Sequence, residues 1–191
     1  IDALESTLSN YDVKNAEEVN IFSCQLPFSD VRVNETVFFH SLKHVEPFRR
    51  QFVLSFMDMV NNNFSPEAVE PVLKKYGQTL DWQDGYFRKR PSYAKQHLAE
   101  EFGLTGTPET VAVSIADPDM GTVQINTSRI DLSRGRWEGQ YFTDYPVTIT
   151  ATANEGYEFR GWKGDANTAE ETVTIAVDGG ISLEAVFAKI E

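Results

Sequence analysis

The chain has 191 residues, of which 41% are hydrophobic and 24% charged, so it has the composition of a globular protein and not of a disordered one. A formal net charge of −12 argues against nucleic acid and anionic membrane surfaces as partners. The lack of a run of about 18 apolar residues argues against a membrane span, and the single cysteine, Cys24, excludes an internal disulfide.

The first 33 residues contain two predicted segments. The spacing of Ile1, Leu4 and Leu8 predicts a helix over residues 1–10, and residues 19–33 have an extended pattern typical of an ordered loop or a short strand pair. The chain starts without a methionine or a signal sequence. This start favours a fragment of a longer protein over a processed product.

A long helix beginning near Pro47 should be the core helix of the N-terminal half. Phe48, Phe52, Phe56 and Val60 recur every four residues and form one apolar stripe, and residues 61–63, three asparagines, should end the helix. A shorter helix is predicted before it, over residues 37–42, with Asn34 as its N-cap.

Two more helices are predicted before residue 105. Ser65 and Pro66 are the N-cap and first residue of one, which Gly77 closes. Residues 81–85 read as a polar connection, and residues 86–102 as a helix in which Pro91 marks a kink or a new start. Gly103 is placed to be its left-handed C-cap.

Three runs in this half, residues 48–52, 61–69 and 90–104, occur in the order expected for the C-terminal part of the CotH family, of spore-coat-protein-H type, and resemble it. The resemblance covers roughly residues 35–104 and implies an atypical protein-kinase fold that transfers phosphate from ATP to protein side chains. The connection over residues 76–90 is shorter than the family's, and no acidic metal motif precedes the Phe48 helix. Residues 81–84 follow that helix, so no catalytic role is transferred to them.

After a short linker at residues 105–108 the pattern changes from helical spacing to strict alternation. Strands are predicted over residues 111–115, 121–125, 137–142, 146–153, 157–161, 172–177 and 181–187, separated by turns rich in Asp, Asn and Gly. The fold class is therefore α+β: a mainly helical region, residues 1–104, followed by a small antiparallel β-rich module, residues 110–191.

Residues 121–123, 139–142, 146–151, 156–162 and 183–187 carry a second resemblance. In this order they are similar to the divergent B-repeat modules of internalin-B-like bacterial surface proteins, over about residues 110–188. The resemblance implies a grasp-like β module on secreted or wall-exposed proteins, used as a spacer or an adhesive surface, with no catalytic residues.

No catalytic, cofactor-binding or metal-binding residues are assigned from the sequence. Trp162 and Trp137 are candidate interaction residues because sugar rings stack on flat aromatic faces, and Trp162 either faces solvent or closes the core. Asp81 and Asp84 are either paired acids of a ligand site or turn formers.

Other polar residues are read as structural. His40 and His44 lack a third metal ligand, His97 lies on an apolar helix face, and residues 88–90, Arg-Lys-Arg, read as a solvated helix end.

The sequence thus predicts the non-catalytic C-terminal part of an exported bacterial CotH-like protein, located outside the cell or on its surface. Its expected partners are the remainder of its own polypeptide and a cell-surface protein or polysaccharide. Two alternatives stay open: part of an ATP-dependent protein phosphotransferase, and a carbohydrate-binding module.

Overall fold

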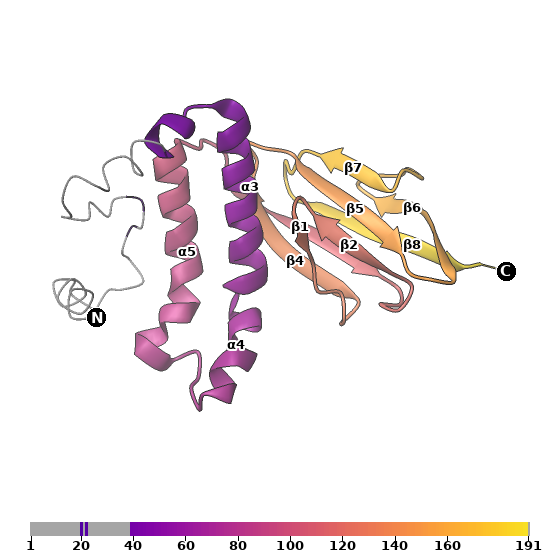
Figure 1. Cartoon of the computed structure of the whole chain (residues 1–191), viewed down its shortest axis with the longest axis horizontal. Coiled ribbons are helices and arrows are strands. Elements are labelled where there is room, and N and C mark those ends of the chain that lie inside the picture. The colour runs from indigo at the N-terminus through magenta and orange to yellow at the C-terminus, as the bar shows by residue number, and fades with distance from the viewer. Residues whose placement is uncertain (1–19, 21, 23–38, 191) are drawn as a thin grey trace.

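A computed structural model describes residues 20, 22 and 39–190 of the chain. A layer of helices lies beside a set of β-sheets (Figure 1), which confirms the expected α+β class. The helix predicted over residues 1–10 and the N-cap Asn34 lie outside the described residues, as does most of the segment 19–33. No described helix has the length and apolar character needed to cross a membrane.

The helical layer contains a helical turn at residues 39–42 and three longer helices, α3 (Glu46–Asn63), α4 (Pro66–Lys75) and α5 (Trp82–Phe102). The caps predicted at Ser65 and Gly103 are confirmed. The Ser65 side chain accepts a hydrogen bond from the Ala68 N–H at the start of α4. Gly103 takes a φ of 55° after α5, and the Leu104 N–H returns to the Ala99 carbonyl at 2.9 Å, so a left-handed residue ends the helix.

The start of α5 differs from the prediction. Residues 82–85 belong to the helix instead of a polar connection, and Pro91 lies inside α5 without starting a new helix. The first turn closes through a hydrogen bond from the Gly85 N–H to the Asp81 carbonyl at 3.3 Å, and Gly85 departs from regular helical geometry with a φ of 78°, which glycine adopts without strain. A polar, glycine-containing stretch can therefore form the first turn of this helix.

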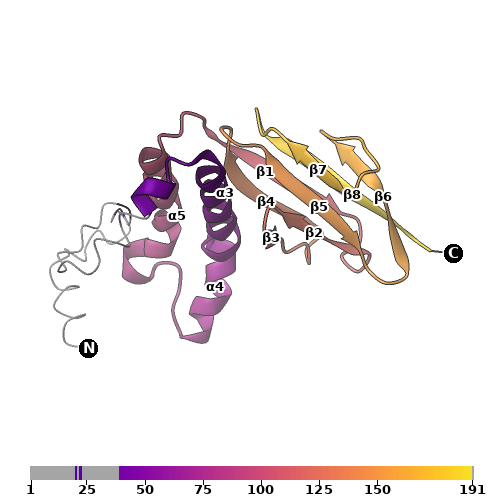
Figure 2. The same ribbon diagram turned by 45° about the horizontal axis from the view of Figure 1, so that its top comes forward.

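The predicted phenylalanine stripe joins α3 to α5. The rings of Phe52 and Phe102 stack with centroids 5.1 Å apart, and Phe48 and Phe56 flank Phe52 on α3. Arg49 also donates to the backbone carbonyl of Phe102, where the C-terminal end of α5 favours a positive charge. This aromatic contact orients the opposite face of α3 toward the sheets (Figure 2).

Eight strands follow: β1 (Pro108–Ile115), β2 (Gly121–Ile125), β3 (Ser128–Arg129), β4 (Arg136–Phe142), β5 (Val147–Ala153), β6 (Tyr157–Gly164), β7 (Thr172–Ile175) and β8 (Ile181–Lys189). Seven of them lie close to the predicted positions, and the two-residue β3 was not predicted. They form two four-stranded sheets, ordered β4-β1-β8-β6 and β3-β2-β5-β7. All neighbours are antiparallel except β1 and β8, which run parallel.

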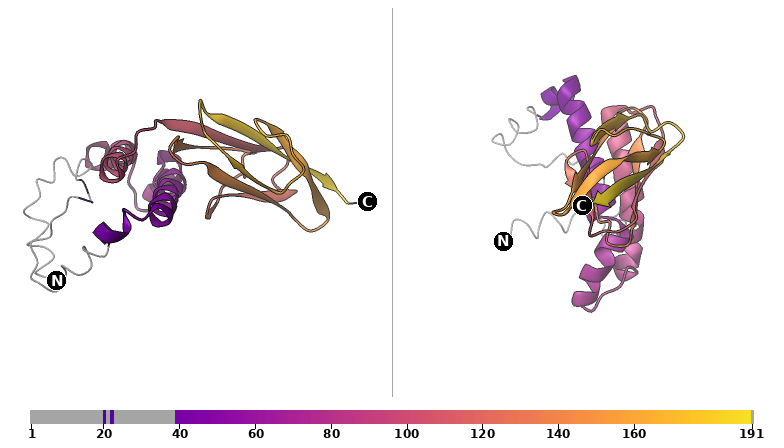
Figure 3. Two further views of the ribbon diagram at one scale, coloured as in Figure 1. Left: turned by 90° about the horizontal axis from the view of Figure 1, so that it is seen from above. Right: turned by 90° about the vertical axis from the view of Figure 1, so that its right-hand side faces the viewer.

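The two sheets form a sandwich that extends away from the helices (Figure 3). Alternate residues such as Val111, Val113, Val123 and Ile149 are fully buried and belong to one core cluster shared by both sheets. The β-rich module is thus two sheets packed face to face. Strands β4 and β3 lie at one lateral side of the sandwich, where α3 packs, and β6 and β7 lie at the opposite side.

Candidate functional site

The contacts between the helices and the sandwich centre on Asp58, in the C-terminal half of α3, which is 1% exposed. Its Oδ1 accepts hydrogen bonds from the Tyr141 hydroxyl at 2.7 Å and the Asn126 amide at 2.9 Å. Its Oδ2 accepts from the Thr127 N–H at 3.3 Å and from the Thr127 hydroxyl at 3.2 Å. Tyr141 is in β4, and Asn126 and Thr127 form the loop between β2 and β3. One carboxylate therefore ties α3 to both sheets. We call these four residues the Asp58 cluster.

The electrostatics of the Asp58 cluster follow from its burial. Burial raises the pKa of Asp58 above the ordinary 3.8, although the hydrogen bonds from Tyr141, Asn126 and Thr127 oppose the shift. Burial raises the pKa of Tyr141 far above its ordinary value, and the negative charge of Asp58 adds a smaller increase. The Tyr141 hydroxyl therefore stays protonated and remains a hydrogen-bond donor. Because Asp58 and Tyr141 are both buried, the cluster is an internal connection and not an acid–base pair open to a substrate.

The next turn of α3 meets the edge of a sheet. The Asn61 side chain accepts from the Gln140 N–H at 3.0 Å and donates to the Gln140 carbonyl at 2.9 Å. Since β4 is an edge strand, the Asn61 amide pairs with it as a neighbouring strand would. Asn62 adds a bond from the Trp137 indole N–H to its Oδ1 at 3.0 Å. Asparagines that were expected only to end the helix therefore fix it to the sandwich.

Close approach of α3 to β4 depends on Gly139. A Cβ atom at this position would lie 2.3 Å from the Trp137 ring and 2.9 Å from Cγ of Asn61. These distances are far below van der Waals contact, so a larger residue would push α3 and Trp137 apart. The glycine is needed here for space between two elements and not for a turn.

A groove of about 510 Å³ opens beside the Asp58 cluster, between the N-terminal half of α3 and the β2–β3 loop. Its lining residues are Glu46, Pro47, Arg50, Gln51, Leu54, Asn126, Thr127 and Thr148. Among the residues that the structure describes, the lining holds one acidic and one basic side chain and no cysteine or histidine. The groove therefore offers polar contacts from side chains of both charges.

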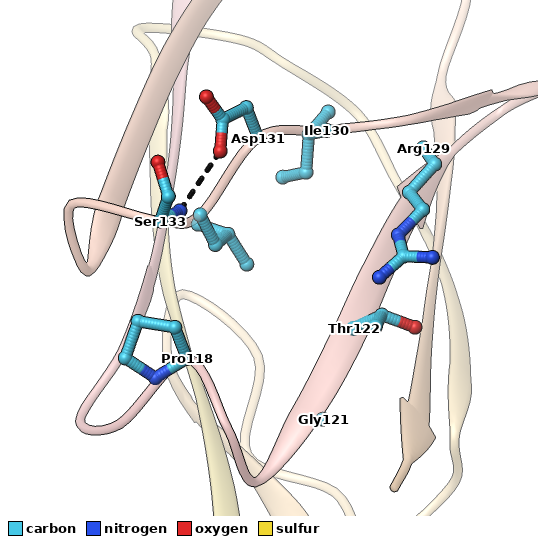
Figure 4. Close-up of a pocket in the computed structure, with 8 residues that line it drawn as sticks. Pro118, Gly121, Thr122, Arg129, Ile130, Asp131 and Ser133 are labelled. Atoms are coloured by element: carbon cyan, nitrogen blue, oxygen red, sulfur yellow. Dashed lines mark hydrogen bonds between the residues drawn. The ribbon is translucent and has the colours of Figure 1, made fainter.

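A second pocket, of about 430 Å³, lies at the side of the sandwich (Figure 4). Thr122 and Arg129 are on one side of it, and Asp131 and Ser133 are on the other. The Asp131 carboxylate accepts from the Ser133 N–H at 2.9 Å, and this hydrogen bond lowers the pKa of Asp131. Asp131 therefore shapes a turn, and among the described residues that line the pocket it is the one carboxylate.

The two tryptophans proposed as interaction residues are buried. Trp162 is 2% exposed and packs against Phe159, with ring centroids 5.4 Å apart, while Trp137 is 9% exposed beneath α3. Neither ring offers a face on which a sugar could stack, so their assignment to a binding surface is corrected. Trp162 closes the core because the φ of 135° at Gly161 lets the strand bend over the sheet edge.

The remaining sequence candidates are not brought together. Asp81 is exposed and pairs with Arg88, its Oδ1 lying 3.0 Å from Arg88 Nε. Asp84 lies in the first turn of α5, and its side chain is outside the described part of the structure. His40 and His44 are exposed, and burial lowers the pKa of the buried His97. Among the residues that the structure describes, no group of three or more His, Cys, Asp or Glu is placed to hold a metal ion.

Sequence reasoning missed the Asp58 cluster. The signal that would have found it is on α3 itself, where Leu54, Asp58 and Asn61 follow one another at helical spacing on the face opposite the phenylalanine stripe. An acid between buried residues on such a face requires donors from another element. The sequence does not identify those donors, because Asn126, Thr127 and Tyr141 lie 68 to 83 residues away.

One comparison with known proteins gives a match. The model of a family described as the divergent InlB B-repeat domain matches residues 132–191, which include β4 to β8. Domains of this type are typical of surface proteins. No curated protein and no solved structure matches the chain. The match confirms the B-repeat part of the second resemblance, whereas the resemblance of the helical half to the CotH family stays a prediction.

Proposed function

We propose that this chain is a non-catalytic part of an exported bacterial protein, in which a B-repeat-type sandwich serves as a cell-surface spacer or interaction module. The observation that carries the proposal is the family match over residues 132–191. The helical half acts as structural support that is fixed to the sandwich. The remainder of a CotH-like polypeptide is the partner proposed for its free faces.

The Asp58 cluster and Asn61 support the role assigned to the helices. A module that holds another domain at a distance must transmit orientation, and a rigid contact between helix and sandwich does this better than a flexible linker. The carboxylate of Asp144 adds to the rigidity because it accepts from the N–H groups of Thr105 and Gly106, each at 2.9 Å, at the connection between the halves.

Surface location is tested on intact cells of the organism that makes the protein. An antibody raised against residues 108–190 should label the cells without lysis, and protease added outside should remove the signal while a cytoplasmic marker survives. Labelling that needs lysis would refute the surface role.

Absence of catalysis is tested separately, by calorimetric titration of this chain with ATP and Mg²⁺. We expect no binding in the micromolar range, because the described groove and pocket contain neither a phosphate-binding loop nor a cluster of metal-binding acids. Micromolar binding would favour the phosphotransferase alternative.

A further inference from the structure

The four edge strands of the sandwich are protected to different degrees against pairing with a strand of another molecule. Asn61 covers the backbone of β4, and β3 is only two residues long. Strand β6 has a bulge between Phe159 and Gly161, and its Trp162 N–H bonds to the Thr168 carbonyl at 2.8 Å, so the following loop covers that edge. These are common ways of preventing edge-to-edge pairing. Strand β7 is four residues long, and within the part of the chain that the structure describes it shows no bulge and no segment paired to its outer edge; it contains no proline, glycine or lysine.

The register of β7 shows which of its backbone groups point outward. The Ala151 N–H bonds to the Glu171 carbonyl at 2.9 Å, so residues 171, 173 and 175 direct their N–H and C=O groups toward β5. Thr172 and Thr174 then alternate with them and direct these groups to the free edge. The side chains agree with this register. Each of the two threonine hydroxyls lies 3.0 Å from the hydroxyl of the threonine opposite it on β5. Side chains come this close where the two facing residues exchange no backbone hydrogen bonds.

The side chains of β7 also leave room for another strand. Val173 and Ile175 pack against the core but are only half-buried, since β7 is the last strand of its sheet. Thr172 and Thr174 are exposed on the outer face. In a strand added next to β7, apolar residues at alternate positions would cover Val173 and Ile175. Small polar residues between them would lie beside Thr172 and Thr174 on the outer face.

We propose that β7 binds an extended segment of a basic protein partner by β-strand addition. Main-chain hydrogen bonds to Thr172 and Thr174 hold the segment, and apolar residues at alternate positions cover Val173 and Ile175. The charges select the partner: Glu170 and Glu171 precede β7 and Asp178 follows it, in a chain of net charge −12. Lysine or arginine at the ends of the segment would attract these acids. A second copy of the chain would instead add a net charge of −12 and be repelled.

The probe is a synthetic peptide of sequence Lys-Val-Thr-Val-Thr-Val-Lys, titrated into the whole chain and followed by NMR. We expect saturable binding, with the amides of Thr172 and Thr174 newly protected from hydrogen exchange and those of β3 unchanged. A version of the peptide with glutamate at both ends should bind at least roughly tenfold more weakly. Absence of binding, or equal binding of both peptides, would overturn the proposal.

Two variants at position 174 distinguish the contribution of the backbone N–H to peptide binding from that of the side chain. Thr174→Pro removes the outward N–H and keeps every backbone bond to β5, although it loses the hydroxyl bond to Thr148, as Thr174→Val also does; it should weaken binding roughly tenfold or more. Thr174→Val keeps the N–H and should bind as the wild type does. If Thr174→Pro binds normally, the site is elsewhere. If sedimentation shows that the chain dimerises and that Thr174→Pro abolishes the dimer, a second copy is the occupant and the proposal of a basic partner is wrong. The inference concerns β7 alone and does not depend on the surface location of the protein.

Discussion

At the scale of single residues, Asp58 connects stability to pH. Its folded pKa is raised above 3.8 by burial, so the folded state binds the proton more tightly than the unfolded state does. The stability that this group contributes is therefore full below about pH 4 and is lost as the pH rises through the folded pKa. Asp58→Asn does not titrate. The difference in unfolding free energy between wild type and this variant should be greatest at acidic pH and fall as the pH rises.

The measurement is denaturant unfolding at a series of pH values. Asp131→Asn is a matched variant whose effect on the unfolding free energy should depend on pH in the opposite direction. The hydrogen bonds from Ser133 lower the pKa of Asp131, so its contribution is present at neutral pH and lost as the pH falls through the folded pKa. A wild-type advantage over Asp58→Asn that grows with pH would contradict the account of Asp58 given above.

At the scale of elements, three consecutive asparagines at the end of α3 allow a matched comparison. Asn61→Ala removes two hydrogen bonds and leaves the Gln140 N–H and carbonyl at the partly buried edge of β4 without their partner. We expect a loss of about 1–3 kcal/mol in unfolding free energy. Asn63 is exposed, so Asn63→Ala should change stability by less than about 0.5 kcal/mol. Equal effects of both substitutions in urea unfolding would show that Asn61 does not hold the helix to the strand.

The connection between α5 and β1 is a second element-scale test. Asp144 holds the N–H groups of Thr105 and Gly106, and the Thr143 N–H bonds to the Thr107 carbonyl at 3.1 Å. Limited proteolysis should therefore cut residues 105–110 slowly in the wild type and at least severalfold faster in Asp144→Ala, because cleavage needs local opening. Cleavage that is equally rapid in both proteins would mean that Asp144 does not restrain the linker. The division into residues 1–104 and 110–191 stays a prediction.

The sequence predicted those elements whose signal is local. Alternation located seven of the eight strands, Ser65 and Gly103 marked helix ends, and the phenylalanine stripe identified the face of α3 that packs against α5. Prediction failed where a residue's role is decided by a distant partner. Asp58 and Asn61 look like solvated helix residues until β4 and the β2–β3 loop are placed against them, and Trp162 alternates like an exposed residue until the bulge in β6 turns it inward.

At the scale of the whole molecule, the family match and the fold have different boundaries. The matched residues 132–191 contain β4, β6 and β8 of one sheet, but β1 lies between β4 and β8 in that sheet. Likewise β2 pairs with β5 in the other sheet and precedes the match. The structural unit that carries the B-repeat sequence therefore includes β1 to β3, and its lateral side at β4 and β3 is covered by α3.

This difference predicts how fragments behave. Residues 132–191 alone should not fold, because β4 and β8 share no hydrogen bonds and Val111 and Val113, both 0% exposed, would be missing from the core. Residues 105–190 should fold, but less stably than the whole chain, since Tyr141 and Trp137 lose their partners on α3. Circular dichroism and urea unfolding of the two fragments decide the matter. A cooperative transition in residues 132–191 would mean that β1 is added to a finished module, whereas full stability of residues 105–190 would mean that α3 contributes nothing to the sandwich that it covers.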